Sequence, residues 1–126
     1  MIGKEKLFKK LEAVLKNSRA DETEIVYYGE ESGLTRYANS MIHQNVHENN
    51  RQVMFRAILG KRVGMASTNS LIDADLRTTL DNAIAIAETQ PENKLFPGLP
   101  RPAQYRTVHA FDKATAACTP MQRARI

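Results

Sequence analysis

The sequence lacks the features that mark a secreted or membrane protein. Its 126 residues include a single cysteine, Cys118, so no disulfide can form within the chain. The first ten residues, MIGKEKLFKK, hold no apolar run of signal-peptide length. No later segment has the roughly 20 apolar residues that a membrane-spanning helix needs. These absences predict a soluble cytoplasmic protein with no membrane contact.

Motifs for several common chemistries are also missing. Gly60 and Gly64 stand apart, so there is no glycine-rich phosphate loop, and no G-x-S-x-G sequence marks a serine nucleophile. Cys118 has no obvious histidine partner to activate it. We therefore predict no catalytic residue in this chain.

Positive charge is scarce on the part of the chain that is expected to fold. Residues 1–100 carry 13 Lys and Arg against 13 Asp and Glu, so the net charge of +4 comes entirely from the last 26 residues, which hold five basic side chains and one acidic one. A nucleic-acid-binding domain normally concentrates its basic residues on a folded face. Nucleic acid is therefore an unlikely partner on this pattern.

The composition is that of one folded domain. The hydrophobic share of 42% and the charged share of 25% are ordinary for a globular protein. A chain of this length can bury one core but is too short to suggest two.

Two segments have helical periodicity. Residues 4–17 place apolar side chains on one stripe with lysines opposite, which predicts an amphipathic helix of about three turns. A second helix is expected from Asp73, which can serve as its cap, to the neighbourhood of Pro91, which cannot continue it.

The residues between these helices favour strands. We expect about five short strands between residues 24 and 68, with the first ending near Glu31-Ser32-Gly33 and a turn or bulge at Asn39-Ser40. Gly60-Lys61 predicts a two-residue hairpin with glycine at its first central position. Gly64 indicates a close backbone approach or a small residue under a helix.

The expected fold is therefore α+β. Strands joined by short turns must be antiparallel, and the two helices can cover one face of the resulting sheet. We expect this domain to occupy residues 1–92 and a proline-rich linker or arm to occupy residues 93–126. Thr119-Pro120 predicts the start of a further helix, which we expect to continue past Ile126 in a longer chain; a frayed tail of a complete small protein is the alternative.

Two histidines four residues apart, His43 and His47, have the spacing of the zinc-protease sequence H-E-x-x-H. That motif needs a helix and a glutamate as general base, whereas position 44 is glutamine and the surrounding residues favour a strand. On a strand the two side chains stand about 13 Å apart, too far to share one ion. We predict no metal site here.

Three stretches of the chain resemble the N-terminal domain of the TldD/PmbA family: TRYANSMIHQNVHE, VMFRAILGKRVGMASTN and LRTTLDNAIAIAE. The resemblance runs from about residue 20 to the end. Its most specific parts are Arg36-Tyr37-Ala38-Asn39 with Ile42-His43-Gln44, and Gly60-Lys61-Arg62 with Gly64. Proteins of this family were first called modulators of DNA gyrase and later recognised as zinc-dependent peptidases, so the resemblance implies proteolysis by the complete protein.

The resemblance also implies where the chemistry lies. The family's metal motif, a helical H-E-x-x-x-H with a later cysteine, follows this domain, and nothing in these 126 residues matches it. Zinc is thus implied for a full-length protein and no metal or catalytic residue for this segment. Family subunits pair, as homo- or heterodimers, around a cavity that admits an unfolded peptide, and in some pairs only one subunit holds the complete metal motif.

Polar residues on the strands between residues 34 and 49 could receive an extended peptide as an added strand. Arg36, Asn39 and Gln44 are the candidates for contact with substrate or a partner subunit. An alternative stays open, in which Asn39 is a turn residue and the other two lie on an exposed strand face. A second hypothesis for the whole chain is a freestanding module that binds a protein partner through its sheet edge.

Overall fold

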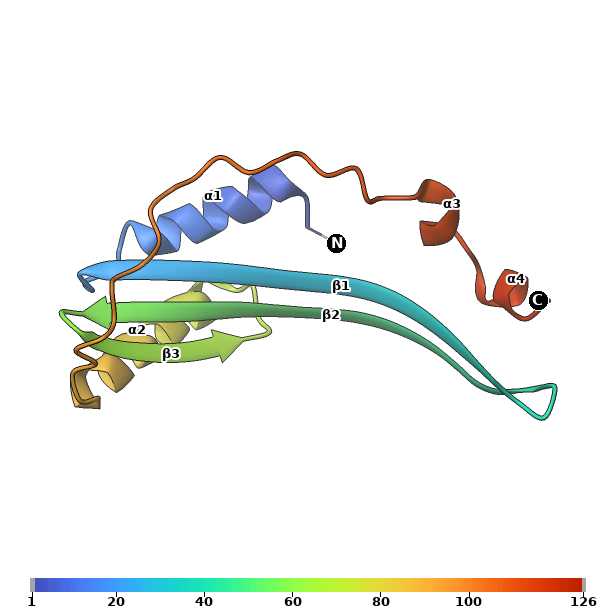
Figure 1. The fold of residues 1–126 in the computed structure, drawn as a ribbon, viewed down its shortest axis with the longest axis horizontal. Coiled ribbons are helices and arrows are strands. Elements are labelled where there is room, and N and C mark those ends of the chain that lie inside the picture. Colours follow the sequence, from blue (N-terminus) through green and yellow to red (C-terminus); the bar gives the residue numbers. More distant parts are fainter. Residues whose placement is uncertain (1, 126) are drawn as a thin grey trace. The chain divides into compact units, whose positions relative to one another are not determined.

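The chain forms an α+β structure with one antiparallel sheet, as predicted. The computed structural model describes residues 2–125 (Figure 1). Within them the strands form one sheet in the order β1-β2-β3. The elements along the chain are α1 (Lys4–Leu15), β1 (Glu22–Ala38), β2 (Met41–Leu59), β3 (Arg62–Thr68), α2 (Asp73–Thr89), α3 (Lys113–Ala116) and α4 (Pro120–Arg123).

The prediction of about five strands is wrong, because two long strands each replace two short ones. β1 runs without a break through Glu31-Ser32-Gly33, and β2 runs through Asn49-Asn50. Residues of these types have low strand propensity, but β1 and β2 pair as neighbours in the sheet. The hydrogen bonds of that pairing outweigh the local preference of a few residues.

The chain divides into two compact units. The first contains Met1–Gly29 and Arg51–Pro100, and the second contains Glu30–Asn50 and Arg101–Ile126. The first unit therefore holds α1, β3, α2 and one end of the β1–β2 pair. The second holds the β1–β2 hairpin with its turn, together with α3 and α4.

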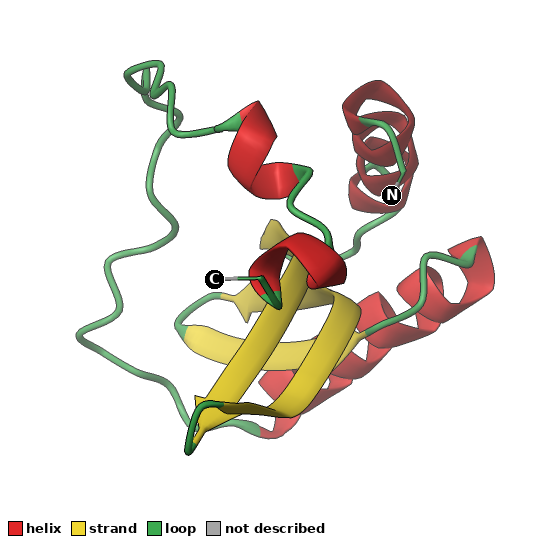
Figure 2. Cartoon of the chain, turned by 90° about the vertical axis from the view of Figure 1, so that its right-hand side faces the viewer, coloured by secondary structure: helices red, strands yellow, loops and turns green. Residues whose placement is uncertain are grey.

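The core of the first unit lies between the two long helices and one face of the sheet. Alternate residues of β2, namely Val53, Phe55 and Ala57, are fully buried against α2 and against Val14 of α1. Both helices lie on the same side of the strands (Figure 2). The alternation of β2 and the helical stripes thus predicted this arrangement correctly. The α2 side chains in the core cluster are Leu76, Leu80, Ala83 and Ile84.

The hairpin between β2 and β3 needs its two glycines for different reasons. Leu59 pairs with Arg62, so Gly60 and Lys61 form the predicted two-residue turn, and Gly60 has a φ of +61°. Gly64 lies directly beneath α2, where a Cβ would come within 2.0 Å of the Ala83 carbonyl oxygen. The predicted close approach at Gly64 is confirmed.

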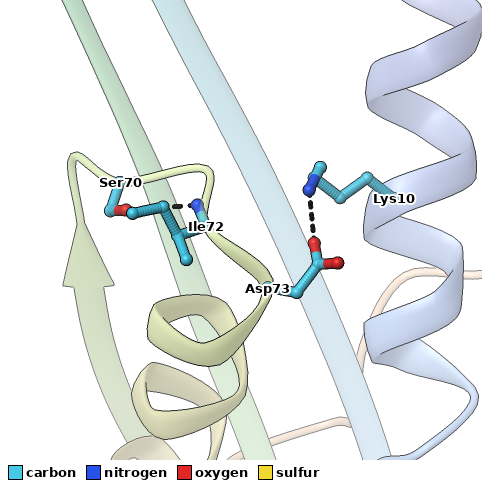
Figure 3. Close-up of polar contacts among 4 residues, drawn as sticks. All are labelled: Lys10, Ser70, Ile72 and Asp73. Carbon is cyan, nitrogen blue, oxygen red and sulfur yellow. Dashed lines mark hydrogen bonds and ion pairs between the residues drawn. The ribbon is translucent and has the colours of Figure 1, made fainter.

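The start of α2 differs from the prediction. Ile72, not Asp73, occupies the N-cap position, and no side chain caps the helix. The Asp73 carboxylate instead pairs with the Lys10 ammonium of α1, while the Ser70 hydroxyl accepts a hydrogen bond of 3.1 Å from the Ile72 N–H (Figure 3). An ion pair with a neighbouring helix has thus replaced the local cap.

The turn between β1 and β2 places two non-glycine residues in the left-handed region. Asn39 has a φ of +51° and Ser40 a φ of +59°. Positive φ at both central positions is typical of a type I′ turn, for which Asn-Gly is the preferred sequence. Asparagine tolerates this conformation, but serine is strained there by about 1 kcal/mol.

We therefore expect Ser40→Gly to stabilise the hairpin by up to about 1 kcal/mol. Amide hydrogen exchange of residues 36–43 should slow several-fold, as measured by NMR. Asn39→Gly serves as the matched control and should help less, because asparagine already accepts a positive φ. Faster exchange in Ser40→Gly than in the unsubstituted chain would contradict the strain argument.

The C-terminal arm contains two single-turn helices after an irregular, exposed stretch. Asp112 caps α3 by accepting a 2.6 Å hydrogen bond from the Thr115 N–H, and hydrogen bonds from Thr115 lower the pKa of this carboxyl group. Thr119 and Gln122 form a reciprocal capping box around Pro120. The predicted helix start at Thr119-Pro120 is confirmed. Across residues 2–125, no helix is long and apolar enough to span a bilayer.

Candidate functional site

The three predicted contact residues all lie on the β1–β2 hairpin of the second unit. Arg36 belongs to β1, Gln44 to β2, and Asn39 to the turn between them; all three are exposed. The Thr35 hydroxyl donates to the Asn45 side-chain oxygen at 3.2 Å, which puts those two residues on one face. Side chains alternate along strands, so Arg36 and Gln44 share the opposite face.

The face of the hairpin that carries Arg36 and Gln44 is called the Arg36 face below. Its polar side chains are available to an external ligand. Among residues 2–125, no hydrogen bond or ion pair engages the side chains of Arg36, Asn39 or Gln44. Exposed apolar residues Leu34 and Ile42 share the face by the same alternation. The guanidinium of Arg36 can donate to carbonyl or carboxylate oxygens, and the Gln44 amide can both donate and accept. The face therefore offers polar groups that can hydrogen-bond to a peptide backbone, together with exposed apolar side chains.

The opposite face of the hairpin holds the C-terminal arm through Arg123. The guanidinium Nε donates to the Thr35 hydroxyl at 3.0 Å, and one terminal nitrogen donates to the Cys118 carbonyl oxygen at 2.8 Å. The Tyr37 hydroxyl donates to the backbone carbonyl of Arg123. The arm segment 118–123 is thus fastened to alternate residues of β1.

Gly33 explains why β1 passes through its predicted break. A Cβ at this position would lie 2.9 Å from both terminal guanidinium nitrogens of Arg123. The glycine therefore leaves room for an arginine within a continuous strand, and it does not end the strand. No role for Arg123 was predicted from the sequence. The capping sequence Thr119-Pro120-x-Gln122 and the Gly33-x-Thr35-x-Tyr37 alternation are both visible there, but neither indicates that these two segments meet.

His43 and His47 both lie on β2, so the helical geometry of a zinc-protease motif is missing, as predicted. The His47 Nε2 atom lies 3.4 Å from the Glu31 carboxylate on β1. Within the part of the chain that the structure describes, no three His, Cys, Asp or Glu side chains come together in a way that could hold a metal ion. The donor set around the histidines therefore does not fit the zinc that the family implies.

These features define an α+β domain with an exposed hairpin. The polar side chains on one face of that hairpin make no hydrogen bond or ion pair within residues 2–125. A family model described as PmbA/TldA metallopeptidase domain 1 matches residues 23–87, which is 65 of 126 residues and just over half of the chain. The chain belongs to this PmbA/TldD family and corresponds to its first domain. A comparison with curated protein sequences gives no significant match.

Two solved structures share the fold. TldE from Thermococcus kodakarensis matches with a TM-score of 0.72 and 20% identity, over 82% of this chain and 23% of that one. A protein from Thermotoga maritima, proposed to modulate a DNA gyrase, matches with a TM-score of 0.71 and 16% identity, over 96% of this chain and 27% of that one. The chain thus spans about a quarter of the length of either structure.

Proposed function

We propose that this chain is the N-terminal domain of a TldD/PmbA-type zinc metallopeptidase, or of the non-catalytic partner of one. In this role it contributes to substrate enclosure and subunit pairing and holds no catalytic residue of its own. The observation that carries the proposal is the family match over residues 23–87, which includes all of β2 and all of β1 except its first residue, with the exposed polar face of the hairpin.

The hairpin suggests how an unfolded peptide is received. β1 lies at an edge of the sheet, where an extended segment can pair with its outer side in the manner of an added strand. Arg36 and Leu34 of β1 then lie beside that segment, while Gln44 and Ile42 of β2, one strand further in, are available to a partner subunit. Backbone pairing is largely independent of sequence, as a peptidase for unfolded substrates requires.

The proposal assigns the metal chemistry to another part of the complete protein. The zinc ligands would come from a helical motif outside residues 1–126, and the ion would supply the chemistry of peptide-bond hydrolysis there. The contribution of this chain's residues is binding and orientation of the peptide and of the paired subunit.

Replacing Arg36 and Gln44 by alanine and Asn39 by glycine, which accepts the positive φ of that turn position, in the complete protein tests this role. We expect cleavage of an unfolded protein substrate to slow about tenfold, mainly through KM, because up to three polar contacts are lost at roughly 0.5–1 kcal/mol each. The rate is measured by gel or fluorescence assay, and pairing by size-exclusion chromatography with light scattering.

A matched control lies on the other face of the same hairpin. The double variant His43→Ala/His47→Ala removes two exposed polar side chains that the proposal does not use, so its cleavage rate should stay unchanged. If the triple variant cleaves and pairs like the unsubstituted protein, Arg36, Asn39 and Gln44 are only surface residues and the proposed contact face is wrong.

The alternative is a freestanding interaction module that binds a protein partner through its sheet edge. The exposed edges of β1 and β3 favour it. The intact mass of the endogenous protein separates the two functions. A mass well above the 14.2 kDa of this chain, with a helical H-E-x-x-x-H in the added sequence, supports the peptidase. A native product of 14.2 kDa supports the module.

A further inference from the structure

A cleft between α1 and the beginning of α2 gathers positive charge within the first unit. Its volume is about 270 Å³. Ala13 and Val14 of α1 supply its apolar lining. The charged side chains around it are Lys6, Lys9 and Lys10 of α1 and Asp73 and Arg77 of α2.

The charge of this cleft is a local concentration. Four cationic side chains and one carboxylate give it a net charge of 4 − 1 = +3, whereas residues 1–100 as a whole carry 13 basic and 13 acidic side chains and are neutral. Positions 6, 9, 10 and 13 lie on one face of α1 because three- and four-residue steps repeat along a helix. The lysines of that face therefore converge on a single space.

The beginning of α2 brings uncapped backbone N–H groups beside the cleft, and the carboxylates of Asp73 and Asp75 in the first turn offset part of their positive potential. No side chain caps this 17-residue helix, so its first backbone N–H groups are not satisfied by a cap. Such groups and the helix dipole together favour an anion. The α2 terminus thus supports the same kind of ligand as the four cationic side chains.

The Asp73 carboxylate is the only negatively charged group among the described residues that line the cleft. Its carboxylate pairs with the Lys10 ammonium (Figure 3). The hydrogen bond and the charge of Lys10, with a smaller contribution from Arg77, lower the pKa of Asp73. The Asp73 side chain is 64% exposed, and exposed ion pairs are weak, so a stronger anion can displace it.

We propose that this cleft binds a small phosphate-bearing anion with two or more negative charges, such as a pyrophosphate or phosphomonoester group, and that the anion displaces Asp73 from Lys10. The volume equals that of about nine waters in the liquid, which accommodates two phosphate groups or one with a short apolar body on Ala13 and Val14. Lysine ammonium groups bind phosphate as point charges, and Arg77 can bind two of its oxygens at once.

The test is a titration of the 126-residue chain with inorganic pyrophosphate at low and at physiological salt, followed by calorimetry and by NMR shifts. We expect saturable binding at one site, with the largest shifts at Lys6, Lys9, Arg77 and the first turn of α2. Citrate at equal ionic strength distinguishes phosphate from carboxylate chemistry. Equal affinity for citrate, or tighter binding of an acidic peptide, overturns the proposed ligand class.

Single substitutions distinguish a specific anion-binding site from attraction of the anion by overall positive charge. Lys9→Gln should weaken pyrophosphate binding about three- to tenfold, while Asp73→Asn should strengthen it by a similar factor because it removes the competing carboxylate. Lys16→Gln, at the C-cap position just after α1 and outside the cleft, is the matched control for charge. Circular dichroism checks that each variant stays folded.

Two outcomes contradict the proposal. Weaker or unchanged binding in Asp73→Asn means that the carboxylate does not compete with the anion. An equal loss of affinity in Lys16→Gln and Lys9→Gln means that only overall charge attracts the ligand. Because neither readout involves peptide cleavage, this test stands apart from the proposed peptidase role.

Discussion

Replacing Gly64 with alanine is expected to lower the free energy of unfolding by about 3 kcal/mol or more. The added Cβ would lie 2.0 Å from the Ala83 carbonyl oxygen and 2.4 Å from the Ala87 backbone nitrogen. Both are backbone atoms of α2, so no side-chain rotation can relieve the overlap. The helix or the strand must move as a whole.

The displaced elements carry the core of the first unit. Gly64 pairs with Ala57 of β2, and both Ala57 and Ala83 are fully buried. Moving α2 away from β3 would therefore open gaps around the buried side chains nearby, which are packed at close to crystal density. The decrease in the free energy of unfolding therefore has two causes, the local overlap at residue 64 and the lost contacts of those buried side chains.

Gly60→Ala in the same hairpin is the matched control. A Cβ at Gly60 meets no atom within 4 Å, but the φ of +61° costs alanine about 1–2 kcal/mol. Urea denaturation followed by circular dichroism measures both variants. Gly64→Ala should have much the lower midpoint, and equal stability of the two variants would mean that α2 and β3 are not in close contact.

Replacing Arg123 with alanine is expected to release the C-terminal arm from the β1–β2 hairpin. The change removes the hydrogen bonds to the Thr35 hydroxyl and the Cys118 carbonyl oxygen. For a half-buried guanidinium this loss amounts to about 2 kcal/mol, which raises the open population roughly 30-fold. Hydrogen exchange and limited proteolysis of residues 113–125 should accelerate by that order.

Gly33 provides a second way to disturb the same contact. A Cβ at this position would press on the guanidinium, whose flexible side chain can move aside at the expense of its hydrogen bonds. Gly33→Ala should therefore mimic part of Arg123→Ala. The free energy that holds the arm on the hairpin should fall less in the double variant than the sum of the two single losses. The reason is that both substitutions remove the same interaction.

Arg125→Ala, two residues further on and exposed, controls for loss of charge in the arm. It should leave the exchange and proteolysis rates unchanged. If Arg125→Ala and Arg123→Ala accelerate cleavage equally, or if the effects of Gly33→Ala and Arg123→Ala simply add, the arginine does not hold the arm in the way that the structure indicates.

The candidate site shows where local patterns stop being informative. Arg36, Asn39 and Gln44 were chosen from the sequence for their polarity and their place on strands, and the structure puts all three on an exposed hairpin. Their role as contacts stays a prediction. Arg123 could not be chosen, because its partners Thr35 and Gly33 lie about 90 positions away and nothing in the tail indicates which strand it meets.

The cleft between α1 and α2 also could not be predicted from local sequence patterns. Each lysine of α1 is ordinary on the polar side of an amphipathic helix. Asp73 looked like a helix cap because aspartate before a helical stripe commonly is one. Only the packing of α1 beside the start of α2 brought Lys10 to Asp73 and turned a local signal into a contact between two helices.

By itself the sequence determined the two long helices, the alternating core strand Val53-Phe55-Ala57, the Gly60-Lys61 turn and the family to which the domain belongs, because these depend on neighbours within a few residues or on recognisable motifs. The tertiary structure decided the number of strands, the role of Gly33 and the partner of Asp73. Each of these depends on which distant segment supplies the hydrogen bond or the charge, and that choice is made only when the whole chain packs.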